Sequence, residues 1–205
     1  MNLADLNHFV AQRWDQDLVP RLIDYVKVPA KSPAFDASWA AHGYLAAVIK
    51  DAEAWCRRQD IQGMTIEVVA IDGKTPCLLF DVPATHGLGN DRTVLFYGHL
   101  DKQPVLEDGK LYGRGSADDG YAIYAALTTI AAIDAQGAPR PRCVGIIETC
   151  EESGSPDLPA YLELLTPRFG DVQLVVGLDS GCRNYDQLWV TTSLRGLVGG
   201  TLTVE

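Results

Sequence analysis

Residues 93–101 read TVLFYGHLD, an apolar run that ends in a histidine and an aspartate. Its first part, Thr93–Tyr97, has the composition of a buried β-strand. Two helices and two further strands are predicted downstream, in alternation: a helix at 119–136, a strand at 143–148, a helix at 158–165 and a buried strand at 174–178. This β-α-β-α-β order predicts the α/β fold class, with a mostly parallel sheet and helices on both of its faces.

Upstream of this run the sequence predicts two helices and a pair of strands. The first helix, at 3–27, is expected to be kinked or divided at Pro20, because proline lacks the amide proton that a helix interior needs. The second helix is expected to have Asp36 as its N-cap. Its apolar residues recur at helical spacing and mark the buried face: Leu45, Ile49, Ala52 and Cys56. The two strands follow at 65–70 and 77–82.

The 205 residues carry 27 acidic and 17 basic side chains, which gives a formal net charge of −10. That balance argues against a nucleic-acid partner, since phosphate neutralisation needs a basic surface. The five cysteines are scattered without a CxxC pair, which argues against a disulfide framework and a cysteine-based zinc ribbon. No apolar run approaches the roughly 20 residues that span a bilayer. Since the first residues also lack the features of a secretory signal, we expect a cytoplasmic protein without a membrane partner.

Polar residues cluster where the predicted strands end and where the long helix begins. His99 and Asp101 follow the first strand and face the same side of extended backbone, so Asp101 is placed to hold the imidazole in one tautomer. The pair Asp118-Asp119 precedes the long helix, and Glu151-Glu152 and Asp179 follow the next two strands. In parallel sheets ligands bind outside the carboxyl ends of the strands, so we expect these groups to share one cleft.

Each of these motifs also has a purely structural explanation. A histidine followed by an aspartate two positions later is often a hydrogen-bonded core histidine, acids before a helix often cap it, and a strand-end aspartate often forms a turn. These explanations must all coincide to account for the set, whereas two divalent cations would nearly neutralise five carboxylates in one cleft. Imidazole and carboxylate ligands suit two Zn²⁺ ions, with Mn²⁺ or Co²⁺ as alternatives. In this interpretation one carboxylate of Asp118-Asp119 bridges the two ions and its neighbour caps the helix.

Five runs of the sequence resemble a known family of di-zinc metallopeptidases, which includes acetylornithine deacetylase, succinyl-diaminopimelate desuccinylase, carboxypeptidase G, aminoacylase and the carnosinase-type dipeptidases. The runs are YGHLD at 97–101, DGKLYGRG at 108–115, ADD at 117–119, EESG at 151–154 and LD at 178–179. They are most similar to the carnosinase-type branch, and the resemblance extends from Lys31 to Gly196. It implies a fold like that of the zinc exopeptidases.

The resemblance also implies roles for the residues of the cleft. His99 and Asp179 would bind one metal ion. Glu152 would bind the other ion, and Asp118 would bridge both. Asp101 would orient the imidazole of His99 from outside the ligand shell. The implied cofactors are thus two Zn²⁺ ions held by one imidazole and three carboxylates.

The activity implied by the resemblance is hydrolysis of amide bonds in dipeptides, at C-terminal residues or in N-acyl amino acids. Glu151 would be the general base that takes a proton from a metal-bound water. The substrate would then be a small peptide or an acyl-amino acid. The alternative is a metal-binding module without catalysis, because the family's second metal takes a downstream histidine. The remaining histidines of this chain, His8, His42 and His86, match no such motif.

In this family a smaller domain with lid and dimer contacts is inserted into the catalytic domain. The resemblance therefore divides the chain into residues 1–192, the N-terminal portion of the catalytic domain, and 193–205, the truncated start of the inserted domain. A homodimer would form through the missing inserted domain. Two departures from the family pattern are Gly120-Tyr121 in place of Lys-Gly and the short stretch between Pro104 and Asp108. We expect the chain to be a fragment.

Overall fold

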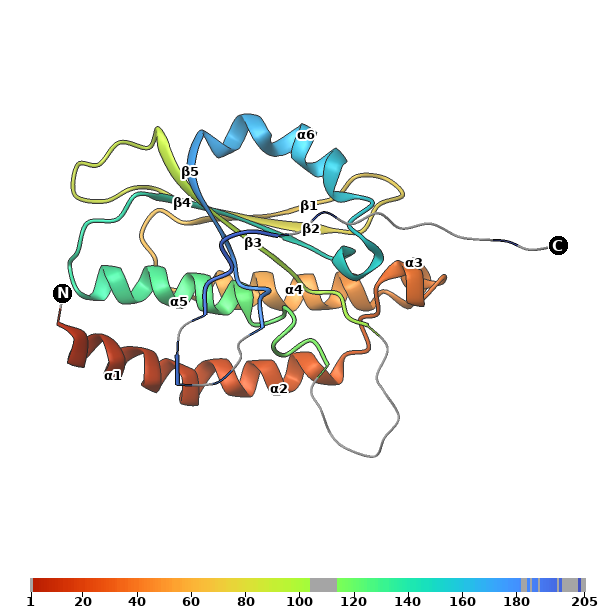
Figure 1. Cartoon of the computed structure of the whole chain (residues 1–205), viewed down its shortest axis with the longest axis horizontal. Coiled ribbons are helices and arrows are strands. Elements are labelled where there is room, and N and C mark those ends of the chain that lie inside the picture. Colours follow the sequence, from red (N-terminus) through yellow and green to blue (C-terminus); the bar gives the residue numbers. More distant parts are fainter. Residues whose placement is uncertain are drawn as a thin grey trace.

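Figure 1 shows the computed structural model, which describes residues 2–103, 114–181, 184, 186–187, 189–194, 196 and 203. Its central element is a five-stranded sheet with the strand order β1-β2-β4-β3-β5. The strands are β1 (Thr65–Val69), β2 (Cys77–Val82), β3 (Arg92–His99), β4 (Arg142–Glu148) and β5 (Asp171–Gly177). β3 pairs in parallel with both β4 and β5, whereas β2 pairs antiparallel with both β1 and β4. Four strands therefore run in one direction, which confirms the predicted mostly parallel α/β fold.

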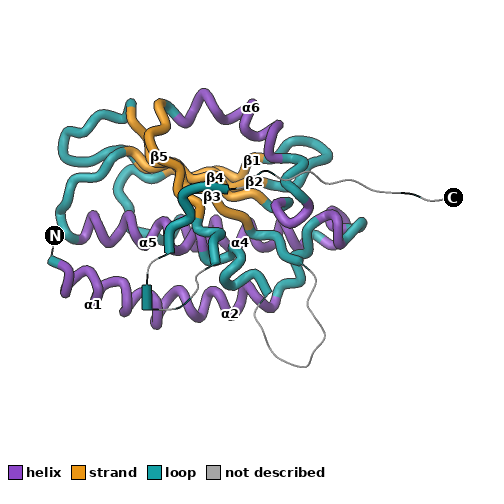
Figure 2. The backbone as a smooth tube through the Cα atoms, in the orientation of Figure 1, coloured by secondary structure: helices purple, strands orange, loops and turns teal. Residues whose placement is uncertain are grey.

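Helices cover both faces of this sheet (Figure 1, Figure 2). The helices are α1 (Leu3–Arg13), α2 (Val19–Lys27), α3 (Trp39–His42), α4 (Tyr44–Cys56), α5 (Ala122–Ala135) and α6 (Leu158–Phe169). α4 and α5 pack on one face with α1 and α2 outside them, while α6 covers the other face. No helix in the described part of the chain is long and apolar enough to cross a membrane.

The face under α4 and α5 holds the larger of two apolar cores. There Trp55 of α4 meets Tyr124 of α5 edge to face, with ring centroids 4.9 Å apart. The residues that were expected on the buried face of the second helix all lie in this core: Leu45, Ile49, Ala52 and Cys56. Their periodicity was a sound guide because a helix that packs against a sheet buries one stripe of its surface.

The first helix is divided ahead of Pro20. A π-helical turn, Trp14–Leu18, links α1 to α2, and Pro20 lies in the first turn of α2. At that position the missing amide proton of proline removes no hydrogen bond from the interior of a regular helix. The predicted division is therefore confirmed, with its boundary before the proline.

The expected N-cap role of Asp36 is wrong. α4 begins after Gly43, whose positive φ of 71° ends the short helix α3 and starts a new one. The carboxylate of Asp36 instead accepts a hydrogen bond from Ser38 N at 3.1 Å and contacts His42 Nδ1 at 2.7 Å. The glycine, which adopts left-handed backbone readily, decides where the helix starts.

The last predicted strand forms as β5 but is not buried. Leu174 and Val175 are 54% and 59% exposed. β5 is an edge strand that pairs only with β3 among the described residues. Its apolar composition predicted a buried strand, because composition does not distinguish an edge strand from a covered one.

The contact between β4 and β2 gives a test of core packing. A Cβ atom at Gly145 of β4 would come within 2.0 Å of the ring of Phe80 on β2. We expect Gly145→Ala to lower the free energy of unfolding by at least about 1–3 kcal/mol, because a packed core cannot take the added methyl group. Urea unfolding followed by circular dichroism measures this change. Gly177→Ala in β5 is the control, since a Cβ there meets nothing within 4 Å, and equal losses in both variants would contradict this account.

Candidate metal centre

The carboxyl ends of β3, β4 and β5 meet at one edge of the sheet. β3 is followed by α5 on one face, and its neighbour β4 is followed by α6 on the other face. Such a reversal between adjacent strands opens a crevice at their carboxyl ends, where ligands of α/β sheets bind. The predicted site residues of this chain gather at that crevice.

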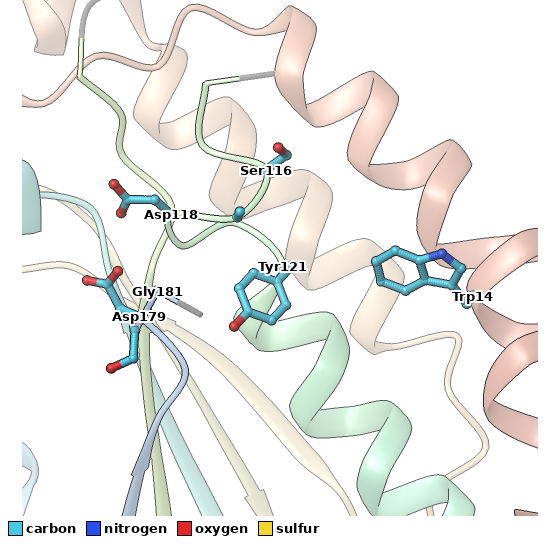
Figure 3. Close-up of a pocket in the computed structure, with 8 residues that line it drawn as sticks. Trp14, Ser116, Asp118, Tyr121, Asp179 and Gly181 are labelled. Atoms are coloured by element: carbon cyan, nitrogen blue, oxygen red, sulfur yellow. The ribbon is translucent and has the colours of Figure 1, made fainter. Parts of the chain in front are cut away.

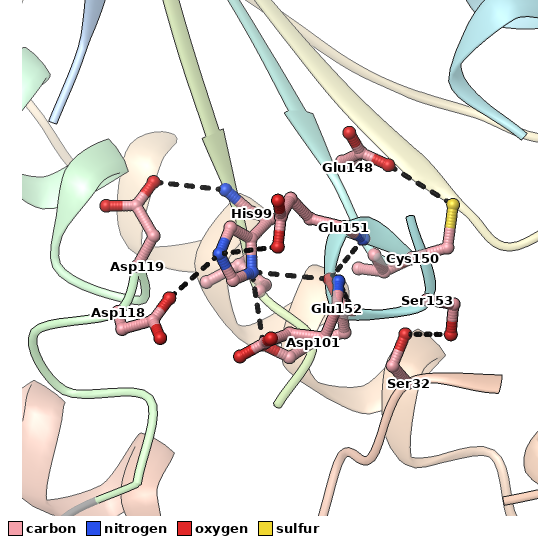
Figure 4. Close-up of polar contacts among 12 residues, drawn as sticks. Ser32, His99, Asp101, Asp118, Asp119, Glu148, Cys150, Glu151, Glu152 and Ser153 are labelled. Carbon is pink, nitrogen blue, oxygen red and sulfur yellow. Dashed lines mark hydrogen bonds and ion pairs between the residues drawn. The ribbon is translucent and has the colours of Figure 1, made fainter. Parts of the chain in front are cut away.

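His99 is the centre of the site. It ends β3, and its side chain is fully buried. Its Nδ1 lies 3.2 Å from the carbonyl oxygen of Asp101 and 3.4 Å from Oδ1 of the same residue. Its Nε2 faces three carboxylates, at 3.2 Å from Asp118 Oδ1, 3.6 Å from Glu151 Oε2 and 3.8 Å from Asp179 Oδ2. Figure 4 shows the first two of these carboxylates beside the imidazole.

The surroundings of this Nε2 fit a metal ion. The atom is buried and has no hydrogen-bond partner. When Nδ1 donates its proton to Asp101, Nε2 points a lone pair at carboxylate oxygens, and these groups repel one another unless a cation or a proton lies among them. A ring nitrogen of His99 and one oxygen each of Asp118 and Asp179 lie within 4.8 Å of one another. An imidazole with carboxylates is a donor set that suits Zn²⁺, Mn²⁺ or Co²⁺.

The pKa values of the site residues are raised, which favours their protonated forms. Burial alone would lower the pKa of His99, but the hydrogen bond and charge of Asp101 and of nearby carboxylates outweigh burial and raise this pKa to about 10. Burial, together with neighbouring carboxylates, also raises the pKa values of Glu151, Glu152 and Asp179. Without a cation the cluster therefore holds protons, which a metal ion would displace on binding.

Asp101 joins His99 to the turn that carries the two glutamates. Its side chain is fully buried. Its Oδ1 accepts a hydrogen bond from Glu151 N at 3.2 Å, and its Oδ2 accepts one from Glu152 N at 3.0 Å. The carboxylate beside the imidazole therefore also holds the backbone of both glutamates.

Glu152 lies beside the cluster of His99, Asp118 and Asp179 but is not part of it. Its Oε2 accepts a hydrogen bond from Gln103 Nε2 at 2.6 Å, while its Oε1 is buried without a hydrogen-bond partner. One oxygen is thus available to a ligand. The role of Glu152 at a second metal ion stays a prediction.

Asp119 belongs to the site, and the helix-cap role expected for the neighbour of Asp118 is wrong. α5 begins only at Ala122, and no side chain caps it. Asp119 is instead fully buried, its Oδ2 accepts a hydrogen bond from His99 N at 3.3 Å, and burial raises its pKa to about 7. Gly98 makes room for this contact, since a Cβ there would lie 2.7 Å from Asp119 Oδ2. A glycine within a strand, directly before His99, signals that another group packs closely there, and this signal could have identified the contact of Asp119.

Several residues considered in the sequence do not join this cluster. Within the described ranges, the other three histidines, His8, His42 and His86, lie outside it. Residues 104–113, which include the short stretch after Pro104 and most of the DGKLYGRG run, lie outside the described residues, as does Cys182. The other four cysteines are buried and carry free thiols.

A pocket of about 540 Å³ opens beside the cluster (Figure 3). Residues from distant parts of the chain line it, among them Trp14, Ser116, Asp118, Tyr121, Asp179 and Gly181. Figure 3 shows the ring of Tyr121 between the two carboxylates and the indole of Trp14. The hydroxyl of Tyr121 donates a hydrogen bond to the carbonyl of Leu178 at 2.6 Å, which ties the start of α5 to the residue before Asp179. No local signal marks Trp14, because only the packing of the first helix brings it to the pocket.

Comparison with known proteins links this geometry to a family. Residues 95–187 match the sequence model described as Peptidase family M20/M25/M40. Beta-Ala-His dipeptidase from Homo sapiens is 34% identical over 134 residues, which cover 56% of this chain and 25% of that protein. The Rattus norvegicus protein of the same name is 34% identical over 132 residues, which cover 56% of this chain and 26% of that protein. The chain thus spans about a quarter of the length of these relatives.

Solved structures share the fold. Human carnosine dipeptidase 1 superposes with a TM-score of 0.68 at 25% identity, over 87% of this chain and 41% of that chain. The di-peptidase Dug1p from Saccharomyces cerevisiae superposes with a TM-score of 0.62 at 22% identity, over 83% of this chain and 40% of that chain. The fold, the cluster around His99 and the match over residues 95–187 agree with one another, and they make this chain similar to members of peptidase family M20/M25/M40.

Proposed function

We propose that this chain is the metal-binding part of a hydrolase that cleaves amide bonds in small peptides or N-acyl amino acids. The observation that carries the proposal is the buried Nε2 of His99, which has three carboxylates and no hydrogen-bond partner around it. The similarity to Beta-Ala-His dipeptidases favours a dipeptide among these substrates.

The ligand assignment is the one that the resemblance implies, and the cluster of His99, Asp118 and Asp179 supports part of it. We assign His99 and Asp179 to one metal ion, Asp118 to a position shared by two ions, and the unpartnered Oε1 of Glu152 to the second ion. Zn²⁺ suits these groups, and so do Mn²⁺ and Co²⁺. A divalent cation held there would supply a Lewis acid that polarises the scissile carbonyl and lowers the pKa of a water molecule.

Glu151 is placed to move the proton of that water. Its Oε2 lies 3.6 Å from His99 Nε2, and its side chain is 33% exposed, so it faces both the cluster and the solvent. Burial and nearby carboxylates raise its pKa, which brings a carboxylate closer to the range in which it exchanges protons at neutral pH. In this proposal Glu151 accepts a proton from the water and returns it to the leaving amine.

The pocket beside the cluster would receive the substrate. Its volume of about 540 Å³ lies within the usual range for small-molecule sites. The carboxylates of Asp118 and Asp179 form one side, and aromatic rings contribute to the wall. A bound peptide could therefore present its amide to the metal side and a side chain to Tyr121 and Trp14.

A metal-binding module without catalysis is the second candidate function. It is favoured by the position of Glu152, since no three-ligand cluster among the described residues includes it. A chain that holds one ion through His99, Asp118 and Asp179 would bind metal without the pair of ions that the hydrolytic proposal uses.

The base assignment predicts the behaviour of Glu151→Gln. We expect the variant to lose at least about 10²-fold in kcat toward a dipeptide, because the amide cannot accept the proton. Its metal content should equal that of the unmodified chain, as measured by atomic absorption after gel filtration. Retained turnover would remove Glu151 as the base, whereas an unmodified chain that binds one metal ion without turnover would favour the module.

The ligand assignment predicts that replacing Asp179 weakens metal binding, whereas replacing a histidine outside the cluster does not. We expect Asp179→Asn to weaken Zn²⁺ binding by at least about tenfold, because an amide oxygen replaces a charged ligand. Isothermal titration calorimetry measures the affinity. His42→Ala is the matched control, since His42 is an exposed histidine outside the cluster. Equal Zn²⁺ affinities of Asp179→Asn and the unmodified chain would contradict the assignment.

Metal removal should make stability depend on pH. The pKa of His99 in the metal-free fold is about 10, above the 6.5 of an ordinary histidine, so the folded state holds a proton that the unfolded state releases. The stabilisation from this proton is complete below pH 6.5 and is lost as the pH rises toward 10. The raised pKa values of Glu151, Glu152 and Asp179 act in the same direction at lower pH.

We therefore expect the Tm of the EDTA-treated chain to fall between about pH 6.5 and pH 8, and Zn²⁺ to raise Tm most at the upper end. Thermal unfolding followed by circular dichroism measures both effects. His99→Gln, whose side chain does not titrate, should show a smaller dependence on pH. A rise in Tm with Zn²⁺ that is the same at every pH would contradict the linkage.

A further inference from the structure

Glu148, the last residue of β4, is a buried acid that the proposed reaction does not use. It is 2% exposed, and none of the ion pairs formed by the described residues includes it. Three donors surround its carboxylate. The hydroxyls of Tyr97 and Ser155 lie 2.6 Å and 2.9 Å from Oε1, and the thiol of Cys150 lies 3.2 Å from Oε2. Figure 4 shows the contact between Glu148 and Cys150 close to His99 and Glu151.

The direction of these hydrogen bonds follows from the donors. Burial, together with the hydrogen bond to Glu148, raises the pKa of Tyr97 well above its usual value. Burial also raises the pKa of the Cys150 thiol to about 12. Both groups keep their protons at neutral pH, and so does the hydroxyl of Ser155. The carboxylate of Glu148 therefore accepts all three hydrogen bonds.

Two of the three donors bracket the turn that carries the catalytic glutamates. The short 3₁₀ turn Glu151–Ser153 follows directly after Cys150 and ends shortly before Ser155. Ser155 has a φ of 52°, a left-handed conformation that residues with a side chain adopt only when their surroundings hold them there. Its hydrogen bond to Glu148 is such a restraint. One buried carboxylate thus holds both ends of the turn.

Other contacts hold the middle of the same turn. Asp101 accepts hydrogen bonds from the backbone of Glu151 and Glu152. The hydroxyl of Ser153 lies 2.5 Å from that of Ser32 and accepts a hydrogen bond from Ala34 N at 2.8 Å. The middle of the turn is therefore held by Asp101 and by the segment around Ser32, and the side-chain contacts of Glu148 act at its two ends.

We propose that Glu148 is a positioning residue. By holding Cys150 and Ser155 it sets the direction in which the carboxylates of Glu151 and Glu152 point, without touching metal or substrate itself. The effect on catalysis rests on the function proposed above. The effect on the turn does not, because it concerns only contacts within the metal-free chain.

Amide hydrogen exchange of the metal-free chain tests the effect on the turn. All five amide protons of residues 151–155 are hydrogen-bonded, two of them to Asp101 and three to carbonyl oxygens of the turn. Glu148→Gln keeps the shape of the side chain but replaces one acceptor oxygen with an amide nitrogen. We expect exchange of these five amides to become about tenfold faster or more, while amides of β3 and α5 keep their rates.

Two further variants make the test specific. Ser155→Ala removes one donor at a partly exposed position and carries the same expectation if Glu148→Gln does not fold. Tyr97→Phe removes a donor to the same carboxylate from outside the turn, so the five amides should keep their rates. Unchanged exchange in Ser155→Ala, or an equal increase in Tyr97→Phe and Ser155→Ala, would overturn the proposal. A uniform increase over the whole fold would also overturn it, since that result describes a residue that only stabilises the core.

Hydrolysis of a dipeptide in the presence of Zn²⁺ tests the catalytic consequence. Glu148→Gln should lower kcat by about tenfold and leave KM unchanged, because the base moves while the pocket stays. If the unmodified chain hydrolyses no dipeptide, the proposed function fails, and the exchange experiment still decides the role of Glu148. If exchange changes as expected but kcat does not, the positioning of the glutamates has no catalytic effect and that part of the proposal is wrong.

Discussion

The buried imidazole of His99 and the carboxylates that face its Nε2 repel one another unless a positive charge lies among them. The three groups of the cluster bring one ligand atom each within 4.8 Å, and the crevice shields them little from one another. Three segments of the chain meet at this point: the end of β3, the residues just before α5 and the residues just after β5. These segments can pack together only when a proton or a cation lies among the carboxylates. A cation that binds at the site therefore also stabilises this part of the fold.

The acidic residues of the site divide into two groups by burial. Asp118, Glu151 and Asp179 face the imidazole, and their side chains are 46%, 33% and 38% exposed. Asp101 and Asp119 are fully buried and accept hydrogen bonds from backbone amides of the site. Hydrogen bonds to buried carboxylates are strong, because the low-dielectric surroundings screen them little. The buried acids therefore fix the backbone, and the exposed acids remain available to a ligand.

The sequence predicted the elements of the fold well because their signals are local. The apolar run before His99, the alternation of strands and helices, and the helical spacing from Leu45 to Cys56 each need only neighbouring residues to be recognised. Errors arose where a distant contact overrides the local pattern. Asp119 resembles a helix cap in sequence, yet its side chain accepts a hydrogen bond from His99 N. The absence of a side chain at Gly98 leaves room for this contact. β5 has the composition of a covered strand, yet it lies at an edge.

From the amino-acid order alone one could therefore infer the α/β class and the chemical types that gather at the strand ends, since both depend on residue type and spacing. The distances among His99, Asp118 and Asp179 could not be inferred, because β5 crosses over to pair with β3 rather than with β4. The same holds for the contribution of Trp14 to the pocket and for the hydrogen bond from Tyr97 to Glu148. Such contacts join residues that are far apart along the chain, and only the packing of helices against the sheet sets which of them meet.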